Sequence, residues 1–184
     1  MRQIPNSPDQ VYYARVEEKG EFFSQFSLKE IVEVSSGLVR IKHEVAEAPL
    51  ECDIGQDDVI YGVKAQIMEC IFNLLDNHYE AGIEKRNKLS DDERAGFSPF
   101  IKLKLTQYDG TSRIEISDNG IGIRDEDKFK IFAPFFTTKS SYKSGSGIGM
   151  YVVKRIIEEN HKGKIFFEST YMQGTKFVIE LPRK

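Results

Sequence analysis

The sequence predicts an α+β fold, a two-layer sandwich in which a mixed, mostly antiparallel sheet is covered on one face by helices. Helical spacing of apolar residues dominates the first half, strand-like alternation follows near residue 101, and the chain closes with a further helix and two strand patterns. Antiparallel strands with one apolar face need a covering layer. The 184 residues suffice for one domain with a sizeable core.

Two helix patterns occupy the first half of the chain. Ser27 precedes Glu30 by three residues, the spacing of a capping box, and apolar residues follow at helical intervals. We therefore expect a helix over residues 28–38. From residue 59 to residue 82 apolar residues again recur at helical spacing, so we expect a long helix over 59–82 that Gly82 ends.

The remainder of the chain predicts the sheet. We expect a helix over residues 148–160, ended by Gly163, between the strand candidates SRIEIS and KIFFEST. The polar residues 84–100 predict a surface loop. Five segments have the pattern of strands: PLECDI, IKLKLTQY, SRIEIS, KIFFEST and TKFVIEL. The letters DGT and YMQG supply the turns of two hairpins.

Composition excludes several classes of function. A net charge of −3 argues against nucleic-acid binding, and no apolar run approaches the ~20 residues that span a bilayer, so we expect no membrane contact by this chain. Cys52 and Cys70 have neither metal-site nor disulfide-framework spacing, which favours a reducing, cytoplasmic location. Residues 1–25 begin with a polar, proline-containing segment and predict a leader or linker rather than a signal peptide.

An acidic residue followed by glycines ends the strand SRIEIS. Asp118 can accept hydrogen bonds from an amine, and Gly120 and Gly122 let a flat ligand approach the backbone closely. The same letters also suit a plain turn or a calcium loop. The calcium interpretation lacks the later carboxylates, including a glutamate at the twelfth loop position.

A second glycine-rich stretch, KSGSGIGMYVVKRII, places Gly145, Gly147 and Gly149 directly before an apolar helix. Such loops often bind phosphate, because free N–H groups and the helix dipole attract anions. It is not a P-loop, since no Gly-Lys-Ser/Thr follows, and Met150 stands where the dinucleotide fingerprint needs a glycine. The alternative is a flexible loop before a core helix.

Asn73 and Asn77 lie four apart on one helix face, beside its apolar positions. An amide oxygen can ligate Mg²⁺ among waters and phosphates, although a surface or capping role is the alternative. The stretch KIFAPFFTTKSSYKSG is unusually apolar for an exposed loop. Phe132 and its apolar neighbours could pack a lid onto the core while Thr137, Thr138 and Lys139 face a ligand; plain core packing is the alternative.

In order, these four stretches resemble the ATP-binding catalytic domain of sensor histidine kinases, a branch of the gyrase, Hsp90, histidine kinase and MutL superfamily. ECIFNLLDNHYEAG is similar to the N box, ISDNGIGI to the first glycine box, IFAPFFTTK to the F box and GSGIGMYVVKRII to the second glycine box. The resemblance covers residues 26–184. It implies a Bergerat-type sandwich with an ATP lid, and it makes residues 1–25 the end of a dimerisation hairpin and its linker.

The resemblance implies ATP and Mg²⁺ as cofactors. Asp118 would accept from the adenine amine, Asn77 would ligate Mg²⁺ with Asn73 beside it, and Lys139 with the amides of residues 145–149 would hold phosphates. Asn73, Asn77 and Lys139 would be the catalytic residues. The residues expected around the nucleotide are Asn73, Asn77, His78, Asp118, Gly120, Gly122, Ile123, Phe132, Thr137, Thr138, Lys139, Gly145, Ser146, Gly147, Ile148, Gly149 and Thr175.

Asn73 decides between subclasses. Hydrolysing relatives have a glutamate at this position, and an amide cannot act as a base at neutral pH. We therefore expect a protein-histidine kinase that phosphorylates a histidine on a dimerisation domain outside this chain, with a response regulator as the further partner. A clamp-type ATPase and a nucleotide-binding regulator without catalysis are the alternatives. His78 replaces the alanine usual in the family, and it either contacts the nucleotide or packs.

Overall fold

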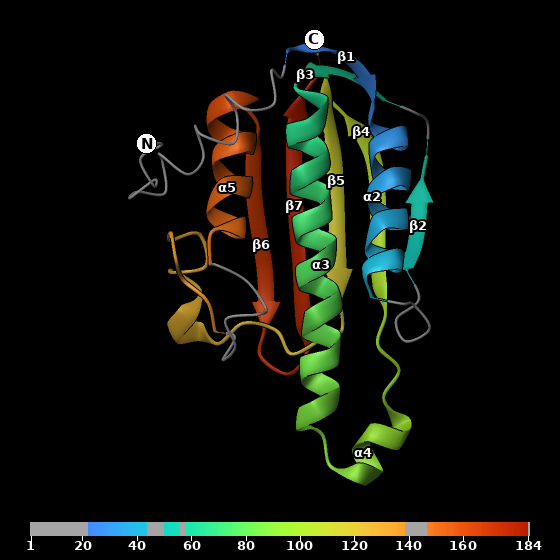
Figure 1. The fold of residues 1–184 in the computed structure, drawn as a ribbon, viewed down its shortest axis with the longest axis vertical. Helices are drawn as coiled ribbons and strands as arrows, with labels where there is room; N and C mark the ends of the chain where they lie inside the picture. The colour runs from blue at the N-terminus through green and yellow to red at the C-terminus, as the bar shows by residue number, and fades with distance from the viewer. Residues whose placement is uncertain (1–21, 44–49, 56–57, 139–146, 184) are drawn as a thin grey trace, which may run out of the picture.

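A five-stranded sheet in the order β2-β4-β5-β7-β6 forms one layer of the molecule (Figure 1). The computed structural model describes residues 22–43, 50–55, 58–138 and 147–183. β2 runs parallel to β4 and the other neighbours are antiparallel, which confirms the predicted mixed sheet. Its strands are β2 (Leu50–Ile54), β4 (Ile101–Tyr108), β5 (Thr111–Asp118), β6 (Lys164–Thr170) and β7 (Gly174–Pro182).

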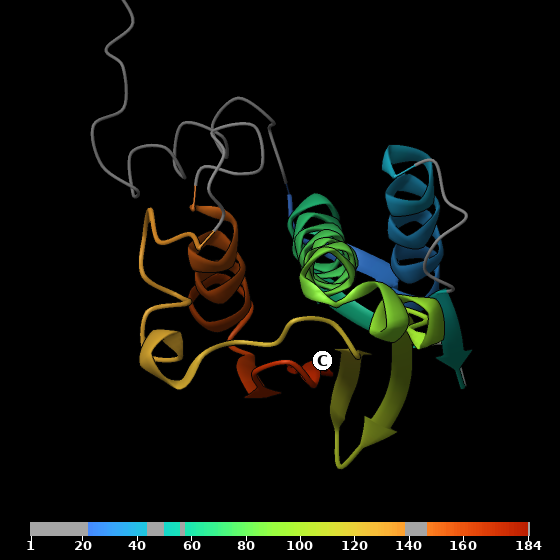
Figure 2. The ribbon, with the colours of Figure 1, turned by 90° about the horizontal axis from the view of Figure 1, so that it is seen from below.

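The second layer consists of helices on one face of this sheet (Figure 2). They are α2 (Leu28–Lys42), α3 (Lys64–Lys88) and α5 (Gly149–Arg155), which continues as a π-helical turn, η2 (Ile156–Asn160). Short α4 (Asp91–Gly96) lies beyond the C-terminal end of α3 (Figure 1). The predicted two-layer α+β sandwich is confirmed.

The core lies between the two layers, and α3 is its central element. Ile67, Ile71 and Leu74 recur every three to four residues along α3 and are fully buried. They pack in one cluster with the inward residues of β4 and β5, such as Leu103 and Ile116. Burying each such side chain stabilises the fold by about 1.5–3 kcal/mol. The spacing continues to His78, so the same packing brings the middle of α3 over the end of β5.

The predicted helix over residues 59–82 is wrong at both ends. Val59–Gly62 form strand β3, which pairs antiparallel with β1 (Ser24–Ser27), so that part of the predicted leader belongs to a small second sheet. Residues 59–62 alternate exposed and buried, which is strand periodicity rather than helical periodicity. Gly82 does not end α3, which continues to Lys88. Gly82 is instead buried against Pro99, whose Cβ would lie 3.2 Å from a Cβ at residue 82.

The predicted loop over residues 84–100 is partly helical. α3 continues to Lys88, and α4 follows after Ser90. Ser90 and Glu93 form a reciprocal capping box, with Ser90 N donating to Glu93 Oε2 at 3.0 Å. The Ser-x-x-Glu spacing was therefore a usable helix signal in this polar stretch.

The other predicted helix ends are close to those observed. Ser27 caps α2, accepting from Glu30 N at 3.0 Å, and the helix extends beyond residue 38 to Lys42. At the far end of η2 the left-handed position falls on Lys162, with φ of 56°, rather than on Gly163. Gly163 is needed for space instead, since a Cβ there would meet Glu180 O at 2.4 Å. In the described residues, no helix combines the length and the apolar content that crossing a membrane requires.

His161 ends η2 as an uncharged, buried link between two elements. Its Nδ1 donates to Ile156 O at 2.8 Å, and its Nε2 accepts from Val63 N at 3.0 Å. Burial lowers the pKa of His161. A positive charge is stabilised at a helix C-terminus. For His161 this stabilisation is smaller than the free-energy cost of removing the charge from water.

We predict that His161 makes the domain less stable in mild acid. Because burial lowers its pKa in the folded state, the unfolded chain takes up a proton first as the pH falls below the usual value near 6.5. The contribution is therefore complete above pH 6.5 and is lost progressively toward the lowered folded-state pKa. Urea unfolding at pH 7.5 and 5.5 measures this loss, and His161→Gln should show a smaller one. An equal loss in both proteins would contradict the prediction.

Candidate functional site

A cavity of about 320 Å³ opens between α3, the end of β5, the start of β7 and the start of α5. Its volume lies in the range of small-molecule sites, and polar groups stand among apolar walls as such sites require. Twelve of the residues expected around a nucleotide line it: Asn73, Asn77, His78, Asp118, Gly122, Ile123, Thr137, Thr138, Gly147, Ile148, Gly149 and Thr175.

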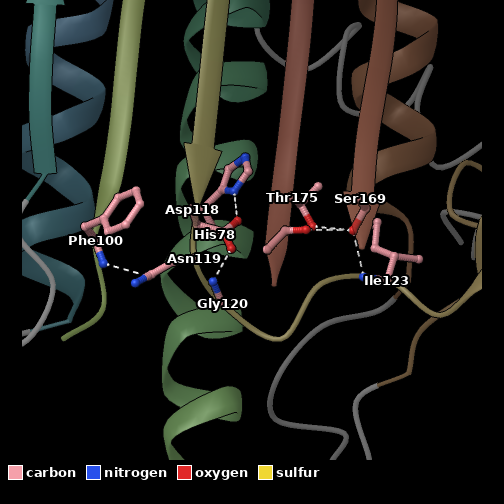
Figure 3. Close-up of polar contacts among 9 residues, drawn as sticks. His78, Phe100, Asp118, Asn119, Gly120, Ile123, Ser169 and Thr175 are labelled. Atoms are coloured by element: carbon pink, nitrogen blue, oxygen red, sulfur yellow. Dashed lines mark hydrogen bonds and ion pairs between the residues drawn. The ribbon is translucent and has the colours of Figure 1, made fainter. Parts of the chain in front are cut away.

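Asp118 is the last residue of β5, and its carboxylate lies in the cavity wall (Figure 3). Its side chain is only 1% exposed. Gly120 N donates to Oδ1 at 2.5 Å, and His78 Nδ1 donates to Oδ2 from α3. A carboxylate has about four acceptor positions, so each oxygen can still accept a hydrogen bond from a ligand.

Asn119 holds the backbone beside this carboxylate. Its Oδ1 accepts from Phe100 N at 2.9 Å (Figure 3). Its Nδ2 donates to Ser98 O at 2.9 Å. Lys85 Nζ donates to Asn119 O at 2.8 Å. The end of β5 is thereby tied both to the segment before β4 and to α3.

The glycine segment after Asp118 is held on both sides by other elements. Ile121 N donates to Ala81 O of α3 at 2.9 Å, while Met172 N of the β6–β7 turn donates to Ile121 O at 2.6 Å. Ile123 N donates to Ser169 Oγ at 2.8 Å, and Ser169 Oγ lies 2.9 Å from Thr175 Oγ1 (Figure 3). This wall of the cavity is therefore held in place by hydrogen bonds within the chain itself.

Two glycines of the site have backbone conformations that other residues rarely adopt. Gly122 has φ of 68°, and a Cβ there would lie 2.2 Å from Thr170 O. Gly147 has φ of 69°, and its Cβ would lie 2.5 Å from the carbonyl carbon of Phe135. Both glycines thus allow close contact between two segments of this chain.

The two asparagines of α3 face the cavity together with the start of α5. Both line it and both are half-buried. Asn73 Oδ1 lies 3.4 Å from the position of a Cβ at Gly149. Amide oxygens, backbone at the start of a helix and a buried carboxylate therefore share one cavity.

Two further carboxylates line the cavity, and both have cationic partners. Asp76 binds Lys42 Nζ through both oxygens at 2.7 Å, and its Oδ1 also lies 2.7 Å from His43 Nε2. Glu84 binds Lys88 Nζ at 2.7 Å. Both carboxylates of this part of the cavity therefore have a cationic side chain beside them.

Some predicted residues lie elsewhere. Gly120 and Phe132 are outside the lining: Gly120 packs against Ala81 of α3, where a Cβ would meet the carbonyl carbon at 2.6 Å, and Phe132 packs edge-on against Phe167 at 6.0 Å and Phe177 at 6.4 Å. Lys139, Gly145 and Ser146 fall outside the described residues. Lining residues not predicted from the sequence are Asp76, Ala81, Glu84, Ile121, Ile131, Phe136, Met150 and Phe177.

Helical and strand periodicity could have indicated several of these. Ala81 and Glu84 lie one and two turns beyond Asn77 on α3, and Phe177 lies two residues after Thr175 on β7. Ile131 and Phe136 belong to the apolar stretch already singled out. Asp76 lies three residues after Asn73 and so shares its helix face, whereas its partners Lys42 and His43, at the C-terminal end of α2, could not be predicted from spacing.

Comparison with known proteins identifies the family. Residues 62–184 match the family model described as histidine kinase-, DNA gyrase B-, and HSP90-like ATPase. The chain belongs to this ATPase family. The resemblance inferred from the four sequence motifs is confirmed.

The relatives of this ATPase domain include sensor kinases. It is 27% identical over 157 residues to sporulation kinase B of Bacillus subtilis, covering 85% of this chain and 33% of that protein. It is 35% identical over 127 residues to sensor protein RprX of Bacteroides fragilis, covering 67% of this chain and 22% of that protein. The chain thus spans about a third or less of these relatives.

Solved structures of similar fold are histidine-kinase catalytic domains. The nucleotide-free catalytic domain of histidine kinase ThkA has a TM-score of 0.70 and 27% identity, covering 88% of this chain and 96% of that one. ThkA in complex with the response regulator TrrA has a TM-score of 0.69 at 24% identity and supports the fold alone.

Substitution of Gly122 tests the close packing of this wall. Gly122→Ala should lower the free energy of unfolding by more than the about 1–2 kcal/mol of a left-handed alanine, because the added methyl also meets Thr170 O. The overpacking adds about 1–3 kcal/mol. Urea denaturation of the variant measures the difference.

Gly110 provides the matched control. It has almost the same φ, 69°, but nothing lies within 4 Å of its Cβ position. Gly110→Ala should therefore show the conformational cost alone. Equal losses in the two variants would mean that the wall at Thr170 yields to the methyl group.

Proposed function

We propose that this domain binds Mg-ATP in the cavity and transfers the γ-phosphoryl group to a histidine on a separate dimerisation domain. The observation that carries the proposal is the cavity itself, in which the buried Asp118 carboxylate, the amides of Asn73 and Asn77, and the start of α5 face one space. Membership of an ATPase family whose relatives include sensor kinases supports it.

Asp118 is suited to bind the base. Its oxygens have only donors as partners, Gly120 N and His78 Nδ1, so the carboxylate faces the cavity as an acceptor. The exocyclic amine of adenine is a matching donor. Hydrogen bonds to a charged group in a buried site are stronger than those between neutral groups.

Asn77, Asn73 and the start of α5 are suited to the phosphate end. An amide oxygen is a ligand that Mg²⁺ accepts together with waters and phosphate oxygens, and we assign this role to Asn77 with Asn73 beside it. Gly147, Ile148 and Gly149 line the cavity at a helix start, where N–H groups of the first turn have no helical acceptor. Lys139, outside the described residues, stays a predicted phosphate contact.

The neighbouring side chains favour transfer over hydrolysis. Bound Mg-ATP would supply the phosphoryl group, whereas the chain would have to supply any base. Asn73 cannot act as a base, and Asp76 and Glu84 are held by cationic side chains. An imidazole nucleophile needs no base of this kind, so the site favours histidine as the acceptor.

The relatives also suggest the partners. The chain spans a third or less of sporulation kinase B and RprX, and ThkA has been crystallised with a response regulator. We therefore propose that a dimerisation domain carries the accepting histidine and that a response regulator takes the phosphoryl group onward.

Asp118→Asn tests the adenine contact. Replacing one carboxylate oxygen by an amide donor removes a hydrogen bond to a charged group, worth about 1.5–3 kcal/mol. Affinity for Mg-ATP should fall about 10–150-fold. Isothermal titration calorimetry with Mg-ATP measures the change. Unchanged affinity would contradict the assignment of Asp118 to the base.

Asp58→Asn is the matched control. Asp58 is a second fully buried carboxylate, but it binds Ser112 near the opposite end of β5 and also lies 2.8 Å from Arg183 Nε. Its substitution should reduce stability and leave the affinity for Mg-ATP unchanged. A similar loss of affinity in both variants would indicate general destabilisation rather than a lost contact.

The reaction is tested by incubating the domain with γ-labelled ATP and a histidine-containing dimerisation domain. We expect acid-labile label on that domain and little free phosphate from the ATPase domain alone. Rapid release of phosphate would favour a hydrolysing clamp. Binding without either product would favour a regulator.

A further inference from the structure

We propose that His78 is a positioning residue that fixes the Asp118 carboxylate for recognition of the adenine amine. The inference rests on the proposed function, since it assumes that a nucleotide base contacts Asp118. The histidine kinases that this chain resembles usually have alanine at this position. From the sequence alone, His78 could either contact the ligand or pack in the core, and the inference assigns it a role.

The contact between the two side chains defines which nitrogen of His78 carries a proton. His78 Nδ1 points at Asp118 Oδ2 across the gap between α3 and the end of β5 (Figure 3). An ionised carboxylate can only accept, so Nδ1 must be the donor. The His78 side chain is 2% exposed and that of Asp118 is 1% exposed, so water competes little for this hydrogen bond.

The carboxylate is held at both oxygens. Gly120 N fixes Oδ1 from the loop and His78 Nδ1 fixes Oδ2 from α3. Two donors on different elements restrict rotation about the last side-chain bond of Asp118. The remaining acceptor positions are then directed before any ligand arrives, which lowers the ordering cost of binding.

The second ring nitrogen of His78, Nε2, argues against a purely structural role for this side chain. Its Nε2 is buried and has no hydrogen-bond partner within the described part of the chain. The ring instead meets Phe177 edge-on, with centroids 5.6 Å apart. A buried polar atom without a partner costs free energy that an apolar residue would avoid, and such departures concentrate at functional sites. The contact with Asp118 is the feature that offsets this cost.

Fixing the carboxylate affects base selection more than general binding. A purine with an amine at position 6 donates to a directed acceptor, whereas a purine with hydrogen there has nothing to donate. His78 should therefore increase the affinity for ATP more than the affinity for purine riboside triphosphate. A side chain that merely filled space would alter both affinities alike.

The test compares His78→Leu with His78→Asn in calorimetry with Mg-ATP and with the magnesium complex of purine riboside triphosphate. Leucine keeps the volume and removes the donor, whereas the asparagine Nδ2 lies near the position of imidazole Nδ1. We expect the loss of affinity in His78→Leu to be at least about tenfold greater for ATP than for the analogue, and His78→Asn to recover most of this difference. Should His78→Leu not fold, His78→Ala takes its place.

Coupling to Asp118 completes the test. In an Asp118→Asn background, His78→Leu should cause no further loss of ATP affinity, because the group through which His78 acts has been changed. Additive losses, or equal losses for ATP and the analogue, would overturn the inference. Wild-type affinity in His78→Leu would also overturn it, whereas failure of the wild-type domain to bind Mg-ATP at all would overturn the proposed function.

Discussion

The packing of α3 across the sheet determines the geometry of the candidate site. Its apolar face is buried against β4 and β5, and this fixes both its height and its rotation over the end of β5. His78 consequently meets Asp118, while Asn73 and Asn77 line the cavity together with the start of α5. A shift of α3 by one residue would rotate all three polar groups by about 100°. The hydrophobic core therefore positions the polar chemistry.

The loop after β5 forms a wall of the cavity, and hydrogen bonds hold this loop against α3 and the β6–β7 turn. Backbone hydrogen bonds join Ile121 both to Ala81 of α3 and to Met172 of the β6–β7 turn. Asn119 adds contacts to the segment before β4. The helix α3 and the β6–β7 turn, which lie more than 80 residues apart in the sequence, thus both contact the segment 119–122. Glycines are required there because the chain contacts itself closely, in addition to any contact with a ligand.

The sheet and its hairpins were predictable because strand alternation and turn residues are local signals. Asp109 and Gly110 both have positive φ, as the Asp-Gly turn predicts. Val59–Gly62 were mistaken for the start of a helix because their apolar residues continue into the spacing of α3, and only pairing with β1 distinguishes them. The motif residues were found by order and spacing. The Asp76 ion pairs depend on the contact between α2 and α3, which no local pattern encodes.

The small sheet of β1 and β3 has a mechanical consequence. β1 is held in register with β3 over four residue pairs, and Val63 alone separates β3 from α3. A displacement of β1 would therefore also move β3 and the N-terminal end of α3, the helix that carries both asparagines.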